Sequence, residues 1–168
     1  FLAADTANLS EADSYKVQFA VHDRLTADGK DQMAGWKVAM TLPSQYEPMK
    51  LSGPVFAGIY KSGVRSSGTV FEKGWPLRAG IECEMVARLA KDVTAGKPYT
   101  AETIKPFISG FFCGAEVLEN RYADFARVSG PGLIADNVLQ AACIVGTEVK
   151  DWQTLDFAAL EGRSVFQG

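Results

Sequence analysis

The chain has 168 residues, of which 47% are hydrophobic and 22% charged, a composition that excludes a disordered protein and favours one folded domain over residues 1–168. A net charge of -3 excludes the broad basic field that binding to nucleic acid or an anionic membrane requires. No apolar stretch approaches the roughly 18 to 20 residues of a membrane span. The first ten residues lack the basic and apolar regions of a signal peptide, so we expect a cytoplasmic protein.

The first predicted element is a helix over residues 10–29, which Ser10 can cap and Gly29 can end. It carries a lone histidine, His22, of a kind that is more often a surface or hydrogen-bonded residue than a catalyst, so we do not expect a Ser-His-Asp triad. The face of the helix expected to pack is an apolar stripe: Val17, Ala20, Val21 and Leu25.

A short apolar run over residues 36–40 predicts a strand with a lysine, Lys37, inside it. Taken alone, such a lysine is more often at a strand edge with its ammonium reaching water, although it could also bind a substrate carboxylate or move protons. Between residues 42 and 75, repeated prolines and glycines predict loops and short strands, which can cover a site.

The clearest predicted strand covers residues 79–89, where apolar side chains alternate with others. Glu82 and Glu84 therefore share one face, with Cα atoms roughly 6 to 7 Å apart at a rise of about 3.3 Å per residue. Two carboxylates at that spacing can converge on one cation. The alternative is that both lie on a solvated face of the sheet.

In the second half, a capped, periodic segment predicts a helix from Thr100 to Phe111, followed by strands over residues 112–118 and 138–145. A polar turn over residues 135–137 precedes the last strand. Glu116 is predicted to lie among apolar groups on its strand, where an unpaired carboxylate is costly to bury. It therefore needs a partner.

The cysteines are three in number, widely spaced and placed in apolar segments: Cys83, Cys113 and Cys143. We expect reduced thiols in the core rather than a disulfide framework or a zinc site.

Glu82, Glu84 and Glu116 together could form an oxygen-rich face for Mg2+ or Mn2+, ions that prefer hard ligands and keep positions open for substrate. Arg121 could orient an anionic substrate or form a structural salt bridge. Asp136 could accept a proton near the site or serve only the turn that contains it.

Four segments stand out together by their order and spacing: GWKVAMT over Gly35–Thr41, IECE over Ile81–Glu84, AEV over Ala115–Val117 with Arg121 beyond it, and IADN over Ile134–Asn137. The combination resembles the 2-keto-4-pentenoate hydratase and 4-oxalocrotonate decarboxylase family of the fumarylacetoacetate hydrolase superfamily. It spans nearly the whole chain.

This resemblance implies an α+β fold, a mixed β-roll with flanking helices, and a homo-oligomer. It also implies that Glu82, Glu84 and Glu116 bind Mg2+ or Mn2+ and that Lys37 is the active-site lysine. With these residues we group Arg121 and Asp136 as candidate catalytic groups. Family members extend further in both directions, so we expect the chain to be incomplete at both ends, with sheet edges left unpaired.

The resemblance further implies a lyase of aromatic catabolism that acts on 2-oxo or 2-hydroxydienoate acids, chelated to the metal through the C1 carboxylate and the C2 oxygen. A hydratase adds water at C4, whereas a decarboxylase loses CO2 from the far end. Val55 stands where hydratases tend to carry an aspartate and decarboxylases an aliphatic residue, and Trp36 with residues 120–125 also looks more like the decarboxylase branch. We expect a hydratase, with a decarboxylase as the near alternative and a non-catalytic binding or assembly protein as the alternative from another class.

Overall fold

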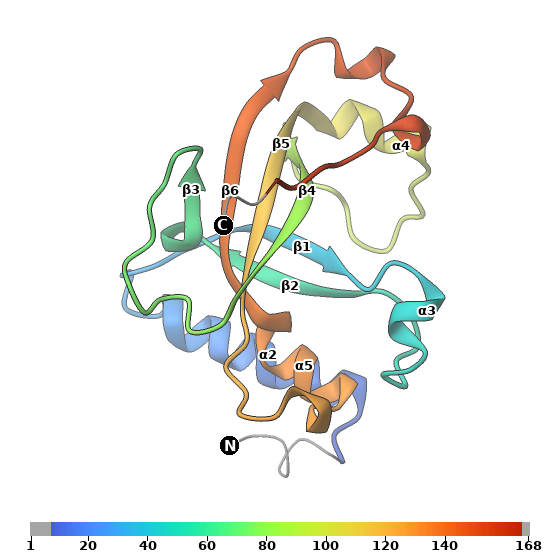
Figure 1. Ribbon diagram of the computed structural model, residues 1–168. Coiled ribbons are helices and arrows are strands. Elements are labelled where there is room, and N and C mark those ends of the chain that lie inside the picture. Colours follow the sequence, from blue (N-terminus) through green and yellow to red (C-terminus); the bar gives the residue numbers. More distant parts are fainter. Residues whose placement is uncertain (1–7, 166–168) are drawn as a thin grey trace.

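The computed structural model describes residues 8–165 as an arrangement of helices and two sheets (Figure 1). The helices are α2 (Glu11–Thr26), α3 (Pro43–Tyr46), α4 (Ala101–Ile104) and α5 (Gly130–Ala135). The strands are β1 (Met33–Ala39), β2 (Val55–Tyr60), β3 (Val64–Ser66), β4 (Ala79–Leu89), β5 (Ile108–Glu119) and β6 (Gln140–Val149). Single 3-10 turns lie between these elements at Lys61–Gly63, Lys105–Phe107, Phe125–Arg127 and Asn137–Leu139, and two more follow β6 at Trp152–Thr154 and Phe157–Ala159.

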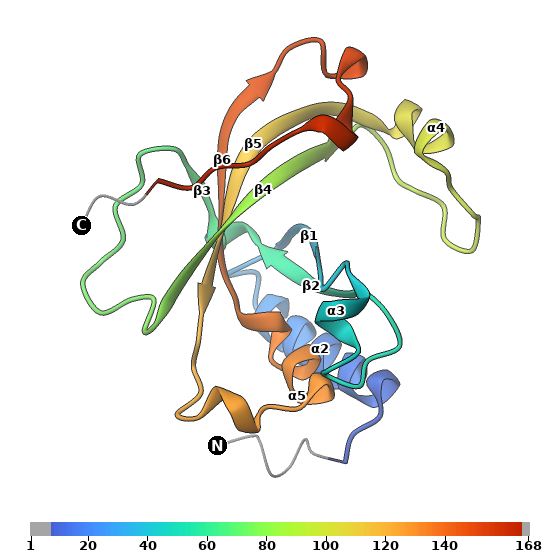
Figure 2. The same cartoon turned by 45° about the vertical axis from the view of Figure 1, so that its right-hand side comes forward.

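The larger sheet is mixed and has the order β3-β6-β5-β4. Strand β3 pairs with β6 in parallel, while β6 with β5 and β5 with β4 are antiparallel. The smaller sheet is the antiparallel pair of β1 and β2. Both views of the ribbon place this pair between the larger sheet and helices α2 and α5 (Figures 1 and 2). The predicted α+β class is confirmed.

Strand β4 begins and ends at the residues that the alternating sequence predicts. It pairs with β5 over nearly its whole length, from Ala79 opposite Glu119 to Leu89 opposite Ile108. Alternation along a strand sends successive side chains to opposite faces. The glutamates of β4 therefore point to one face, and Ile81 and Met85 to the other, where they are 40% and 43% exposed.

The hydrophobic core lies below the larger sheet, where β2, α5 and the turn after α5 meet. Its most enclosed members include Val55, Ala57 and Ile134, each at most 1% exposed. Val55 is therefore a packing residue, surrounded by apolar neighbours such as Leu51 and Leu133.

Helix α2 begins after Ser10, whose hydroxyl accepts a hydrogen bond from the Asp13 amide at 3.1 Å, as predicted. It ends at Thr26, three residues before Gly29. The predicted packing face is wrong, because Val17, Val21 and Leu25 of the apolar stripe are 41 to 49% exposed and Ala20 is exposed as well.

The buried residues of α2 are polar: Ser14, Gln18 and His22. The Gln18 amide donates to the carbonyl oxygens of Ile134 at 2.8 Å and Phe56 at 3.2 Å. The helix turns this face inward because the backbone of α5 and β2 presents carbonyl groups that need donors there.

The predicted helix from Thr100 to Phe111 is too long. Helix α4 gives way to a 3-10 turn that contains Pro106, and residues from Ile108 onward belong to β5. Proline blocks the continuation of a helix. Pairing with Ala87 and Leu89 of β4 then extends the strand backwards through Phe111 and Ile108.

Two of the three cysteines differ from the prediction. Cys83 and Cys113 are exposed, because they alternate onto the open face of β4 and β5, and only Cys143 is buried. All three are free thiols. Among residues 8–165, none of the helices has the length and apolar character needed to cross a membrane.

Candidate metal centre

The three glutamates singled out in the sequence converge on one face of the larger sheet. Glu82 of β4 is the direct partner of Glu116 on β5, and Glu84 follows two residues along β4. One oxygen from each of the three carboxylates lies within 4.8 Å of the other two. The shared face of Glu82 and Glu84 is thus confirmed, and pairing of the strands adds Glu116 to it.

The three carboxylates differ in their surroundings. Glu116 is 5% exposed, as predicted, whereas Glu82 and Glu84 are exposed. Burial raises the pKa of Glu116 to about 7, against the attraction of Lys37 and with a further increase from the charges of Glu82 and Glu84. Burial, together with the charge of Glu82, also raises the pKa of Glu84. Raised pKa values of this kind mean that further positive charge near the cluster, such as that of a bound cation, would stabilise the ionised carboxylates.

Lys37 reaches the cluster from the other sheet. Its ammonium donates to Glu116 Oε1 and, at 2.7 Å, to the carbonyl oxygen of Val138. The side chains of Lys37 and Glu116 are only 9% and 7% exposed, so the lysine does not reach out to water as one reading of the sequence suggested. An ammonium has three N–H donors. Two of them are used here, which leaves one for a ligand.

The Val138 carbonyl is presented by a turn of unusual backbone geometry between α5 and β6. Asn137, Val138 and Leu139 all have φ between 50° and 59°, in the left-handed region. For a β-branched residue such as Val138 this conformation is a marked outlier. Strained backbone of this kind persists only where neighbouring structure holds it, and it concentrates at functional sites.

The side chain of Asn137 holds the turn in place. Its Oδ1 accepts from the Gly58 amide at 2.8 Å and from Nε2 of His22 at 3.0 Å, and its Nδ2 donates to the Gly58 carbonyl at 2.9 Å. His22 is accordingly a buried, hydrogen-bonded residue, in agreement with one of the readings of the sequence. Sequence reasoning did not assign this role to Asn137. The available signal was its residue type, because asparagine tolerates left-handed backbone better than most residues.

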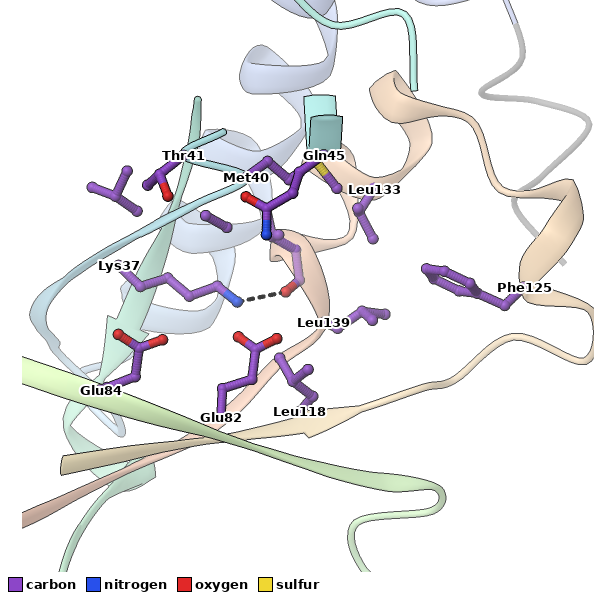
Figure 3. Close-up of a pocket in the computed structure, with 13 residues that line it drawn as sticks. Lys37, Met40, Thr41, Gln45, Glu82, Glu84, Leu118, Phe125, Leu133 and Leu139 are labelled. Atoms are coloured by element: carbon purple, nitrogen blue, oxygen red, sulfur yellow. Dashed lines mark hydrogen bonds between the residues drawn. The ribbon is translucent and has the colours of Figure 1, made fainter. Parts of the chain in front are cut away.

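A cavity of about 540 Å³ opens beside the cluster (Figure 3). Glu82 and Glu84 stand on β4 and point toward Lys37 at one end of it. Thr41 and Gln45 also line the cavity, and its other wall is apolar, formed mainly by Met40, Leu118, Phe125, Leu133 and Leu139. The cavity thus combines a charged end and an apolar end, as small-molecule sites commonly do.

The fold brings the side chains of Arg121 and Asp136 into contact with each other. The Arg121 guanidinium contacts the Asp136 carboxylate at 3.0 Å and its backbone carbonyl at 3.0 Å, and it also pairs with Glu119 at 3.3 Å. Neither Arg121 nor Asp136 lines the cavity. The geometry therefore supports the structural salt bridge left open by the sequence, and a direct catalytic role for either residue stays a prediction.

No protein-family model and no curated protein matches the sequence. Among solved structures, the chain is similar to 4-oxalocrotonate decarboxylase from Pseudomonas putida G7, in a complex with magnesium and adipate and in a complex with calcium and acetate. The TM-scores are 0.77 and 0.75, at 21% and 20% sequence identity, over 86% of this chain. The fold is that of these decarboxylases.

The structural likeness supports, at the level of the fold, the resemblance predicted from the four sequence segments. The chain spans about half the length of the solved structures that it matches, 54% and 53% of them.

Proposed function

We propose that the protein is a divalent-metal-dependent lyase of the fumarylacetoacetate hydrolase superfamily that acts on 2-oxo or 2-hydroxydienoate acids. The observation that carries this proposal is the convergence of Glu82, Glu84 and Glu116, with their oxygens within 4.8 Å of one another, beside a lysine in an open cavity. An arrangement in which three acidic groups repel one another costs folding free energy, and a bound cation relieves that cost.

The donor set fits Mg2+ or Mn2+. Its three ligands are all carboxylate oxygens, with neither histidine nor cysteine in the group, which suits hard cations better than zinc or copper. Once bound, such an ion supplies Lewis acidity to the carboxylate and 2-oxo oxygens of an acid that chelates it. Because Glu116 is buried and Glu82 and Glu84 are exposed, a substrate would approach an ion held by these residues from the side of Glu82 and Glu84.

Lys37 is placed to handle charge and protons at the substrate. Two of its N–H groups are fixed by Glu116 and Val138, so the third has a defined direction and can donate to a substrate oxygen. Its contact with Glu116 holds the ammonium beside the carboxylates that would bind the metal. The apolar wall excludes water from the substrate's tail.

The reaction we favour is hydration, the addition of water at C4 of a 2-hydroxydienoate. Decarboxylation of 4-oxalocrotonate is the second candidate, and two observations favour it. The similar solved structures are of a 4-oxalocrotonate decarboxylase. In addition, Val55 sits in the apolar core and offers no carboxylate for activating water.

The test is direct. The purified protein, with Mg2+ or Mn2+ added, is given 2-hydroxypenta-2,4-dienoate and 4-oxalocrotonate, and their ultraviolet absorbance is followed together with CO2 release. We expect turnover of 2-hydroxypenta-2,4-dienoate without release of CO2. We also expect the Glu116→Gln variant to lose this metal-dependent activity. The control is Glu148→Gln, an exposed carboxylate on β6 of the same sheet, which should keep full activity. Absence of turnover with both acids and both metals would refute the lyase proposal.

A further inference from the structure

The end of the cavity away from the glutamates carries no positive charge. Among the residues that line it in the described part of the chain, Lys37 is the one cation, and its ammonium is bound to Glu116 and Val138. Away from the glutamates the wall is formed by apolar side chains, including Phe125, Leu133 and Leu139 (Figure 3). A carboxylate placed against that wall would lose hydration without gaining a partner, which is strongly unfavourable.

One further polar side chain, that of Gln45, lines the cavity and is oriented by a backbone amide that precedes it. Gln45 lies in the single turn of α3, where its Oε1 accepts a hydrogen bond from the Leu42 amide at 3.1 Å. Fixing the oxygen of an amide also fixes its NH2 group. Figure 3 shows the amide nitrogen of Gln45 turned toward the interior of the cavity, above the Lys37 ammonium.

A primary amide is a neutral donor. It can bind a hydroxyl or carbonyl oxygen. It does not supply the positive charge that would compensate a carboxylate for its lost hydration. Two features, the apolar wall and the oriented amide, thus favour the same kind of ligand.

We propose that this end of the cavity selects 2-oxo monocarboxylic acids with an uncharged tail, and that Gln45 is the residue that determines this specificity, by donating a hydrogen bond to a neutral oxygen on the tail. The proposal rests on the proposed function, because it assumes that the acid end of the ligand is chelated at the glutamates. It disfavours a substrate with a second carboxylate, and so favours hydration over decarboxylation of a dicarboxylate.

The experiment is isothermal titration of the Mg2+-loaded protein with a matched set of 2-oxo acids. The acids 2-oxopentanoate and 2-oxoglutarate have the same five-carbon chain and differ in a terminal methyl or carboxylate group. We expect 2-oxopentanoate to bind at least about tenfold more tightly, since an unpaired buried charge is worth more than the 1.4 kcal/mol that a tenfold ratio represents. We expect 4-hydroxy-2-oxopentanoate, which carries a neutral oxygen on the tail, to bind more tightly still.

Variants of Gln45 then test its role. In Gln45→Leu the preference for the 4-hydroxy acid over 2-oxopentanoate should fall to about one, and in Gln45→Arg the ratio between 2-oxopentanoate and 2-oxoglutarate should invert. The control is Gln153→Leu, an exposed glutamine in the turn Trp152–Thr154, which should leave both ratios as in the wild type. Each ratio is taken within one variant, so a change in overall stability does not affect it.

Pyruvate, which carries the 2-oxo acid group but no tail beyond a methyl, separates the two proposals. If pyruvate does not bind to the Mg2+-loaded protein, the proposed function fails and this inference fails with it. If pyruvate binds but 2-oxoglutarate binds as tightly as 2-oxopentanoate, selection for an uncharged tail is wrong while the metal-dependent site stands. If the ratios of the Gln45 variants equal those of the wild type, another residue determines the specificity.

Discussion

Replacing Lys37 with methionine should show that the lysine and a divalent cation neutralise the same cluster of charge. At an effective dielectric constant of about 20, two carboxylate charges 4.8 Å apart repel each other by roughly 3.5 kcal/mol. Lys37 offsets that repulsion through its buried ion pair with Glu116. Removal of one partner from a buried pair costs about 3 to 5 kcal/mol. Protonation of Glu116, with its pKa about 7, can relieve part of this cost at low pH.

We therefore expect Lys37→Met to lower the free energy of unfolding by about 3 kcal/mol at pH 8 with EDTA present, and by less at pH 6. Mg2+ should restore more stability in this variant than it adds to the wild type, because the ion then binds three carboxylates without a competing ammonium. Urea unfolding followed by circular dichroism measures both effects.

Lys16→Met is the matched control for this experiment. Lys16 forms an ion pair with Asp13 on α2 in which the two side chains are 78% and 50% exposed, and such surface pairs contribute about 0 to 1 kcal/mol. The reasoning would be refuted if Lys37→Met lost the same stability with and without Mg2+, because the lysine and the metal would then act independently.

Three further predictions concern single residues. Glu82→Gln should weaken Mg2+ binding at least about tenfold in a calorimetric titration and should raise the free energy of unfolding of the metal-free protein, because it removes one of the charges that repel one another in the cluster; unchanged affinity would remove it from the ligand set. Since the pKa of Glu116 is raised to about 7, its contribution to the stability of the metal-free protein is complete below about pH 4.5 and is lost as the pH rises through 7. Mg2+ binding at pH 7 should accordingly release protons, seen as a buffer-dependent enthalpy that disappears in Glu116→Gln. Asn137→Ala should cost about 2 to 4 kcal/mol in urea unfolding, because it leaves Gly58 and His22 without buried partners; a loss below about 1 kcal/mol would mean that the turn holds itself.

The sequence predicted the parts of the site that depend on local periodicity. Alternation along a single strand placed Glu82 and Glu84 on one face, and the apolar neighbours of Glu116 predicted its burial. The contact between Lys37 and Glu116 joins residues 79 positions apart on different sheets. No local pattern contains such a contact; the family resemblance implied only that both residues belong to one site, and the structure shows the contact itself.

Two differences from the sequence predictions, the packing face of α2 and the start of the strand predicted from Val138, have a common physical origin. The packing face of α2 was inferred on the assumption that apolar side chains point inward, but the neighbouring backbone needed donors and Gln18 was drawn to it instead. Val138 has a left-handed backbone conformation, which β-branched residues rarely adopt. The hydrogen bond between the Asn137 side chain and the Gly58 amide holds the turn in this conformation. In both cases a tertiary hydrogen bond outweighs a local preference, which single-sequence patterns cannot reveal.

The two candidate reactions require the same chemistry at the charged end of the cavity, since both acids present a carboxylate and an adjacent oxygen to the cation. Glu82, Glu84, Glu116 and Lys37 therefore cannot distinguish them, however well their roles are established. The candidate substrates differ at the other end, where a dicarboxylate needs a cation and a dienoate needs an apolar surface. In the described chain that end holds leucine and phenylalanine side chains, and the neutral amide of Gln45 lines the cavity above Lys37 (Figure 3). We therefore expect the choice of reaction to depend on the part of the site that the four sequence segments do not contain.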